Sequence, residues 1–166
     1  IRLLPGGGSC AWFREGDPTG PRYDLGGAMG RFRLDAASGP IVCIAGGSGM
    51  SAIFALLEDA CHAQIPRACH FYYGARQARD LYWQSDIAAI ARNWPADQMF
   101  TYRAVLSDEP RHSAWCGARG FVSDAALAPG EGIDWAAASV FLCGPPAMID
   151  AAIPALIAAG VDSERC

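Results

Sequence analysis

Residues 41–50, IVCIAGGSGM, are the stretch of sequence that decides the fold. Its first five residues, from Ile41 to Ala45, are all apolar, which is typical of a strand buried on both faces. Glycines follow at 46, 47 and 49, and apolar residues then recur at helical spacing from Ile53 to Cys61. The stretch therefore predicts a buried strand, a tight turn and a helix, which together make the first unit of a parallel sheet.

The chain after Pro40 continues this alternation. Three further strands are expected at 69–73, 100–106 and 139–143, and three further helices at 80–93, 122–127 and 145–159. Asp80 is the expected N-cap of its helix, while Pro154 is expected to kink the last helix or to mark a break in it. Repeated β–α units of this kind predict an α/β fold with a doubly wound parallel sheet.

Residues 1–38 differ in composition and in their pattern of apolar residues from the rest of the chain. They are rich in Gly, Pro and Arg, and their short apolar pieces, such as 31–34, predict short antiparallel strands that cannot close a core alone. The small, polar segment 35–39 is expected to connect them to the first buried strand. Two parts are therefore expected, 1–38 and 39–166.

Composition excludes several classes of protein. The chain has 166 residues, of which 52% are hydrophobic and 18% charged, so it has ample apolar material to bury and disorder is excluded. No window approaches the ~18 uncharged apolar residues of a membrane span. All 13 basic residues are Arg, which excludes a GxxxxGK phosphate loop and Schiff-base chemistry. The net charge of −4 argues against nucleic acid as a partner.

The seven cysteines do not form a metal-binding pattern. No CxxC pair exists, and the close four-cysteine spacing of iron–sulfur clusters is absent, so no metal site is expected in this chain. His62 and His70 also lack a metal-like spacing and are expected to be structural or exposed. Like Trp94, Trp83 is expected to be a packing group. The odd number of cysteines favours a reducing, cytoplasmic setting.

Two loops follow expected strands and are candidates for chemistry. Ligands of doubly wound sheets bind at the carboxyl ends of the strands, where residues 46–51 and 143–148 lie. The glycines of the first loop allow backbone amides to approach a pyrophosphate at a helix N-terminus. A simple tight turn is an alternative for that loop, and a buried Cys before a rigid helix start is an alternative for the second.

The two motifs together, with 94 positions from Gly49 to Cys143, carry a family resemblance. The chain resembles the ferredoxin–NADP reductase superfamily and, more closely, the NADH-dependent flavoprotein reductases of bacterial mono- and dioxygenases. Residues 46–51 are similar to that family's GGTG[IM][ST]P loop, with Ser48 in place of Thr and Ala52 in place of Pro. Residues 143–148 match its CGPPAM signature. Residues 71–76 match its YYGAR segment. Residues 106–122 match its stretch of the pattern LS…W.G..G.V.

The upstream residues resemble the flavin-binding part of the same family. Residues 27–32 resemble the turn that ends its flavin barrel, and residues 5–12 resemble the segment that holds the flavin pyrophosphate. The implied FAD contacts are Gly7 and either Ser9 or Cys10, depending on register. The resemblance also implies that 1–38 is the C-terminal part of an antiparallel flavin barrel. The family's RxYS segment would precede Ile1, and its last strand would follow Cys166.

The resemblance assigns roles to the predicted nucleotide site. It implies that Cys143 lies near the nicotinamide carbon that gives up hydride, as a positioning and electrostatic group rather than a nucleophile. The implied NADH contacts are Gly46, Gly47, Ser48, Gly49 and Met50 at the pyrophosphate, Gly74 and Arg76 at the adenosine, Gly144 and Pro145 at the nicotinamide, and Met148 within the signature.

Ser107, Asp108 and Glu109 bear on the choice between NADH and NADPH. NADP-using relatives place an Arg directly after this Ser, whereas two carboxylates stand here, which would repel a 2′-phosphate and suit a ribose hydroxyl. The interpretation is NADH, with a solvated acidic loop as the alternative. Arg76 and Arg111 are near enough to this segment, in sequence or fold, to weaken the argument for NADH.

The implied function is a reductase that oxidises NADH through FAD. Electrons would pass to an iron–sulfur centre outside this chain, on a ferredoxin domain or an oxygenase partner. Two alternatives stay open: a flavin reductase or globin-linked reductase of the same superfamily with another acceptor, and a nucleotide-binding module or fragment without turnover of its own.

Overall fold

The computed structural model describes residue 30 and residues 32–163. Phe32 begins a compact unit that contains the rest of the described chain. The expectations for 1–29, including the predicted FAD contacts Gly7, Ser9 and Cys10, lie outside the described residues.

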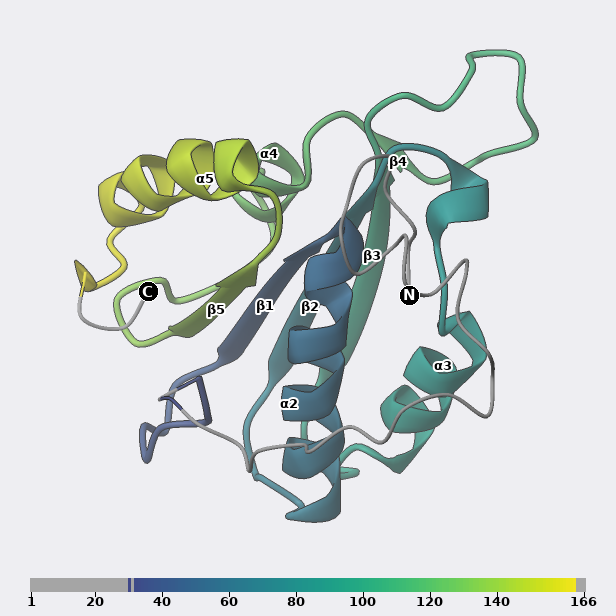
Figure 1. Cartoon of the computed structure of the whole chain (residues 1–166). Helices are drawn as coiled ribbons and strands as arrows, with labels where there is room; N and C mark the ends of the chain where they lie inside the picture. The colour runs from purple at the N-terminus through teal and green to yellow at the C-terminus, as the bar shows by residue number, and fades with distance from the viewer. Residues whose placement is uncertain (1–29, 31, 164–166) are drawn as a thin grey trace, which may run out of the picture. The chain divides into compact units, whose positions relative to one another are not determined.

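The described chain forms a five-stranded, all-parallel sheet (Figure 1). Its strands are β1 (Ile41–Gly46), β2 (Cys69–Ala75), β3 (Phe100–Leu106), β4 (Ala118–Arg119) and β5 (Ser139–Cys143). Their order is β4-β3-β2-β1-β5, so the chain first builds outward from β1 in one direction and then returns to its other side. The predicted doubly wound α/β fold is confirmed, and the topological switch point lies between β1 and β5. Strand β4 was not predicted, because two residues carry no readable pattern.

Helices cover both faces of the sheet (Figure 1). They are α2 (Met50–His62), α3 (Gln84–Asn93), α4 (Val122–Ala126) and α5 (Pro146–Ala158), with the 3₁₀ turns η1 (Gly47–Gly49) and η2 (Ala78–Asp80).

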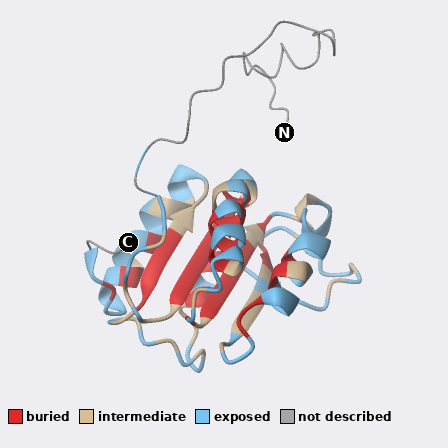
Figure 2. Cartoon of the chain, turned by 90° about the horizontal axis from the view of Figure 1, so that it is seen from below, coloured by how far each residue is buried: buried red, intermediate tan, exposed pale blue. Residues whose placement is uncertain are grey.

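The side chains of β1 alternate between two cores. Ile41, Cys43 and Ala45 pack with α2 and α3, while Val42 and Ile44 pack with α4 and α5. Every residue of β1 is buried, and Figure 2 shows that the buried residues concentrate in the central strands. A strand between two helical layers has no solvent face, which explains the unbroken apolar run at 41–45.

The predicted N-cap at Asp80 is wrong. Helix α3 begins at Gln84, and Asp80 instead closes η2 by accepting a 3.1 Å hydrogen bond from the backbone N–H of Gln77 at Oδ2. Trp83 follows in the left-handed conformation, with φ +57°, and is the actual N-cap residue. Asp80 was predicted from its residue type, but a carboxylate also suits the third position of such a turn, where it accepts from the N-cap backbone as Asp80 does from Gln77.

Pro154 does not break the last helix, which is continuous from Pro146 to Ala158. A proline in a helix removes one hydrogen bond and leaves the carbonyl four residues earlier without its partner. That carbonyl belongs to Asp150, and both residues are exposed, so water can solvate it.

The described residues 32–34 contain no strand, so the strand predicted at 31–34 is not found there. Their side chains pack against the α/β unit instead. The Phe32 ring meets the Phe141 ring edge-on, with centroids 5.7 Å apart, and Leu34 packs on the core that includes α2.

The expected connector 35–39 is held at the amino ends of the strands. The buried Arg67 guanidinium contacts Asp35 Oδ1 at 2.9 Å and Ser139 Oγ at 2.6 Å, and it also donates to the carbonyl of Gly39. Burial acts to raise the pKa of Asp35, but hydrogen bonds from Ser139 and Arg67 outweigh it and hold that pKa below its usual value.

Candidate nucleotide-binding site

The loop after β1 presents backbone rather than side chains. Gly46 ends the strand, Gly47 to Gly49 form η1, and α2 starts directly at Met50. Gly47 has a φ of +53°, a conformation that favours glycine, and a Cβ there would meet no atom within 4 Å. No side chain caps η1 or α2. The first N–H groups of a helix have no intrahelical partner, so this turn is suited to an anion.

The loop after β5 packs directly on the loop after β1. The register pairs Ala45 with Cys143, which brings the two strand ends together. A Cβ on Gly49 would collide with the carbonyl of Cys143 and lie 2.7 Å from the nitrogen of Gly144. Gly49 is therefore required by close approach of two backbones, across the switch point.

Met148 fills the space between two of the predicted glycines. A Cβ on Gly46 would lie 2.5 Å from its sulfur, and a Cβ on Gly144 would lie 3.0 Å from it. Met148 thus packs against both glycines, and the end of its side chain would have to shift for a Cβ at either position.

The Cys143 thiol is free and half-buried at the carboxyl end of β5. Gly144 and Pro145 follow it, and Pro145 is the N-cap residue of α5, with φ −60° and ψ 145°. The predicted site residues of the two loops are thus brought together at one edge of the sheet.

Gly74 has a packing explanation of its own. It lies near the end of β2, and a Cβ there would come within 2.8 Å of the Val122 Cβ on α4. The absence of a side chain at Gly74 therefore lets α4 approach the sheet.

Arg76 and Asp108 form an ion pair at the ends of β2 and β3. Arg76 Nη2 lies 2.8 Å from Asp108 Oδ2, and both side chains are more than half exposed. The backbone continues the ladder beyond the strands, because Ser107 N–H donates to the Ala75 carbonyl at 3.0 Å. An exposed ion pair of this kind adds little to stability, so we expect it to act on ligand binding rather than on folding.

The acidic loop after Asp108 is tied down rather than free. Glu109 Oε2 accepts a 2.8 Å hydrogen bond from the backbone N–H of Ala78, which lowers the pKa of Glu109. Arg119 on β4 donates to the carbonyl of Glu109 at 2.7 Å and to Ser113 Oγ at 3.2 Å. Sequence reasoning missed Arg119, because its partners depend on β4 pairing with β3.

Tyr82 also escaped sequence reasoning. Its hydroxyl donates to the carbonyl of Gly47 at 3.0 Å, from the connection between η2 and α3. The two residues are 35 positions apart, and no local pattern links them.

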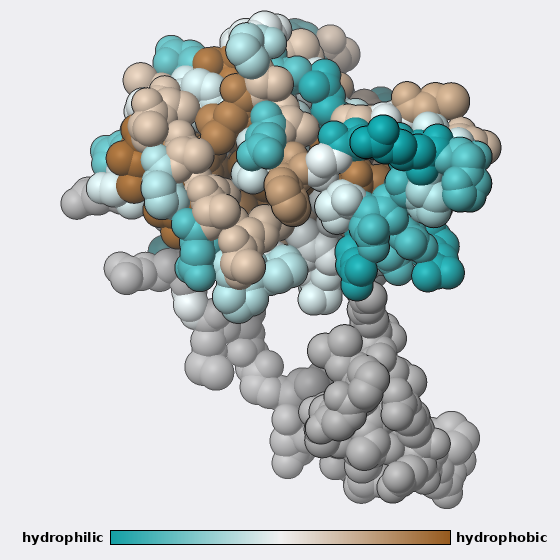
Figure 3. Space-filling view, turned by 90° about the horizontal axis from the view of Figure 1, so that it is seen from above, coloured by the Kyte–Doolittle hydropathy of each residue, from teal (hydrophilic) through white to brown (hydrophobic). Residues whose placement is uncertain are grey.

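The surface at the carboxyl ends of the strands has two sides. Figure 3 shows hydrophilic side chains on the side of the loop after β3 and hydrophobic ones on the side of α5.

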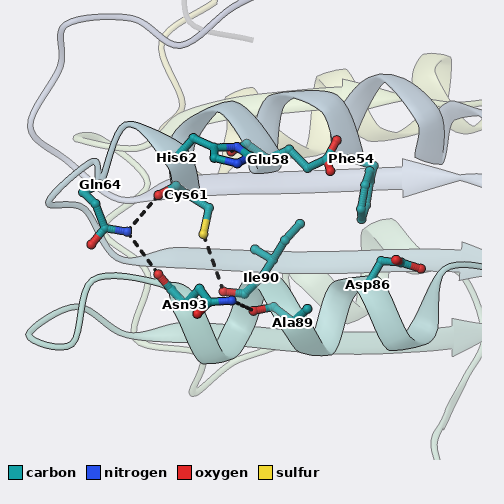
Figure 4. Close-up of a pocket in the computed structure, with 9 residues that line it drawn as sticks. All are labelled: Phe54, Glu58, Cys61, His62, Gln64, Asp86, Ala89, Ile90 and Asn93. Carbon is teal, nitrogen blue, oxygen red and sulfur yellow. Dashed lines mark hydrogen bonds between the residues drawn. The ribbon is translucent and has the colours of Figure 1, made fainter.

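A separate groove of about 390 Å³ lies between α2 and α3. Its polar walls bond to one another, for example through Gln64, whose side chain donates to the carbonyls of Cys61 and Asn93 (Figure 4). It contains none of the predicted binding residues.

Both histidines predicted to be structural or exposed fit that description. His62 is exposed on α2, with Nδ1 2.9 Å from the Glu58 carbonyl oxygen. His70 is buried beside Thr101 Oγ1, and burial lowers its pKa.

Within residues 32–163, no group of three His, Cys, Asp or Glu side chains could hold a metal ion. In that same range, no helix has the length and apolar character needed to cross a membrane.

Fold and site together define a dinucleotide-binding α/β domain. Residues 43–153 match the family described as the oxidoreductase NAD-binding domain, and the chain belongs to this family.

Similar proteins are reductase or electron-transfer components of oxygenases. The chain is 37% identical over 169 residues to the xylene/toluene monooxygenase electron transfer component XylA of Pseudomonas putida, covering 99% of this chain and 45% of XylA. It is 33% identical over 158 residues to the phenol 2-monooxygenase reductase component DmpP of Pseudomonas sp. (strain CF600), covering 95% of this chain and 44% of DmpP. The chain thus spans less than half the length of these relatives.

Solved structures share the fold. The Amycolatopsis cytochrome P450 reductase GcoB has a TM-score of 0.83 at 32% identity, covering 99% of this chain and 49% of GcoB. A flavohemoglobin from Malassezia yamatoensis, with bound FAD and heme, has a TM-score of 0.74 at 20% identity, covering 99% of this chain and 41% of its own. The second likeness concerns the fold alone.

Proposed function

We propose that this chain is the NADH-binding part of a flavoprotein reductase that passes electrons through FAD to an iron–sulfur centre and an oxygenase. The single observation that carries the proposal is the pair of glycine loops packed together at the switch point, between β1 and β5. The names of XylA and DmpP, an electron transfer component and a reductase component of monooxygenases, support the same class of activity.

The loop after β1 fits the pyrophosphate of NADH. A Cβ at Gly47 would meet no atom within 4 Å, so the loop leaves space there, and the first N–H groups of a helix without intrahelical partners are natural donors to a phosphate. We assign the pyrophosphate to Gly46, Gly47, Ser48, Gly49 and Met50. The loop offers backbone N–H groups, although that of Met50 already donates to the carbonyls of Gly47 and Ser48, and the exposed Ser48 adds a hydroxyl.

The loop after β5 is assigned to the nicotinamide. Gly144 and Pro145 would line the ring, and the half-buried Cys143 would orient it from the end of β5. The redox chemistry is supplied by the bound NADH and FAD, while the chain binds, orients and excludes water.

The pairing of Arg76 with Asp108 favours NADH over NADPH. A free guanidinium at the adenosine side would attract a 2′-phosphate, but the Asp108 carboxylate at 2.8 Å neutralises it. The carboxylate itself would repel that phosphate and can accept a hydrogen bond from a ribose hydroxyl. Gly74 and Ser107 belong to the same edge and are assigned to the adenosine side.

Residues 1–31 are assigned to the end of the flavin barrel, with FAD held in part by Gly7 and Ser9 or Cys10, whereas residues 32–38 belong to the α/β unit. The likeness of residues 5–12 and 27–32 to flavin-binding segments supports this. The iron–sulfur centre is placed outside this chain. The five free thiols of the described residues suit a reducing, cytoplasmic setting.

The test uses the full-length protein reconstituted with FAD. We expect a flavin absorbance band near ~450 nm that is bleached anaerobically by NADH, because the flavin carries the redox step. Subsequent addition of a ferredoxin-type acceptor should restore the band. Binding of NADH without any bleaching would leave only a nucleotide-binding module and refute the proposal.

A further inference from the structure

Tyr82 connects the predicted pyrophosphate loop to a different part of the fold. Its hydroxyl donates to the carbonyl of Gly47 at 3.0 Å, at the one glycine of the loop that combines a positive φ with open space. Burial raises the pKa of Tyr82 above its usual value. The phenol is therefore protonated at neutral pH and can act as a donor.

The position of Tyr82 follows from an unusual backbone turn at the next residue. Trp83 adopts φ +57°, which is strained for a bulky side chain. Two sets of contacts compensate. The carbonyl of Trp83 accepts the first hydrogen bond of α3 from Ile87, and its ring packs 4.6 Å from Phe54 and 5.2 Å from the Tyr82 ring.

We propose that Tyr82 is a positioning residue for the pyrophosphate loop, set in place by the left-handed turn at Trp83. By holding the carbonyl of Gly47, its hydroxyl keeps the following amides in the orientation in which they meet the nucleotide. This inference rests on the proposed function of the loop.

The physical basis is pre-organisation. A glycine with open space around it has more accessible backbone conformations than any other residue, and a ligand that orders it must offset that entropy. A hydrogen bond formed before the ligand arrives removes part of this penalty from binding. The Tyr73 ring, edge-on to Tyr82 at 5.8 Å, restrains the phenol from the other side.

The experiment removes only the hydroxyl, through Tyr82→Phe in the full-length protein reconstituted with FAD. ADP-ribose, which carries the pyrophosphate without nicotinamide, is titrated by calorimetry, and flavin reduction by NADH is followed in a stopped-flow instrument. We expect the Kd for ADP-ribose and the KM for NADH to rise about two- to tenfold, the range of one lost hydrogen bond. The reduction rate at saturating NADH should stay within about twofold of the wild type.

Tyr102→Phe is the matched control. It removes the same atom from a tyrosine whose hydroxyl donates to Gln84 Oε1 at 3.0 Å instead of to the loop. The control should bind ADP-ribose as the wild type does, and thermal unfolding of both variants shows whether either change acts through stability.

The role of Trp83 is tested with Trp83→Gly, which keeps the left-handed backbone accessible but deletes the ring. If Trp83 acts through Tyr82, its effect on the Kd for ADP-ribose should be clearly smaller in the Tyr82→Phe background than in the wild type. Fully additive effects would overturn this part of the proposal.

The remaining outcomes separate the two proposals. Equal Kd values for Tyr82→Phe and Tyr102→Phe would overturn the role of Tyr82, as would a lower saturating rate with unchanged Kd. Failure of the wild type to reduce its flavin with NADH would instead overturn the proposed function. In that case the ADP-ribose titration still decides the role of Tyr82.

Discussion

The two ends of the sheet differ in how their polar groups are satisfied. At the amino ends of the strands, Arg67 is buried and bonded to Asp35, Gly39 and Ser139. At the carboxyl ends, the turn at Gly47–Gly49 has no capping side chain. One end satisfies its polar groups within the chain, while the other leaves N–H groups available.

This difference reflects the separate roles of the two ends. A buried guanidinium is tolerated only when its donors are paired, and within the described residues no buried side-chain nitrogen or oxygen lacks a partner. A binding edge needs the reverse, because donors already paired cannot bind a phosphate. The comparison predicts that changes at the amino ends act on stability and that changes at the carboxyl ends act on nucleotide binding.

The largest expected effect is that of Arg67→Ala on stability. It leaves Ser139 and the carbonyl of Gly39 with fewer partners in a buried place, and Asp35 without its counter-ion. We expect the free energy of unfolding to fall by about 2–3 kcal/mol, below the usual figure for a fully buried pair because Asp35 is partly exposed. Denaturant titration measures it.

Arg103→Ala is the control for that experiment. Arg103 pairs with Glu131 at 2.7 Å but is 46% exposed, so its removal should change stability by less than about 1 kcal/mol. Equal losses in the two variants would contradict the special role given to the amino-end network.

The next largest effect is expected for Gly49→Ala, at the carboxyl ends. The added Cβ collides with the backbone of Cys143 and Gly144, which cannot move as a flexible side chain would. The two loops must separate, at about 1–3 kcal/mol of stability and with more than tenfold weaker ADP-ribose binding. Ser48→Ala, in the same loop but exposed, should be much milder; a Gly49→Ala protein with normal binding would show that the close approach is not needed.

A smaller effect, on specificity, is expected for Asp108→Asn. It removes the carboxylate that neutralises Arg76, so the ratio of kcat/KM for NADPH to that for NADH should rise about tenfold, or about 1.4 kcal/mol. Stability should barely change, because the pair is exposed. Steady-state kinetics with both nucleotides measures the ratio, with Asp97→Asn as a surface control. A wild type that already prefers NADPH would disprove the interpretation of this edge.

The smallest effect is a pH dependence at the amino ends. The pKa of Asp35 is lower in the folded chain than in the unfolded one, so its stabilisation is present above the unfolded value near 4 and is lost as the pH falls through the folded value. Asp35→Asn should therefore reduce stability by about 1 kcal/mol at pH 7 and by less below about pH 4. Chemical denaturation at several pH values tests this, and a constant difference would contradict it.

Local pattern explains what sequence reasoning predicted correctly. The first strand was predicted at 41–45 from its apolar run and is found at 41–46, and the helix after it was predicted from the spacing of Ile53 to Cys61. Both signals come from neighbours within a few positions, which is the range over which periodicity operates. The error at Asp80 arose where residue type alone was used to place a helix boundary, and the same applies to the break that was one of the two expectations for Pro154.

By itself, the sequence determined the alternation of strands and helices, the two glycine loops and the family. Only the tertiary structure decided which distant residues meet: Arg67 with Asp35, Arg76 with Asp108 and Tyr82 with Gly47. Each of these contacts joins residues about 30 or more positions apart. They depend on the order β4-β3-β2-β1-β5, which is set by the packing of whole elements rather than by any local pattern of residues.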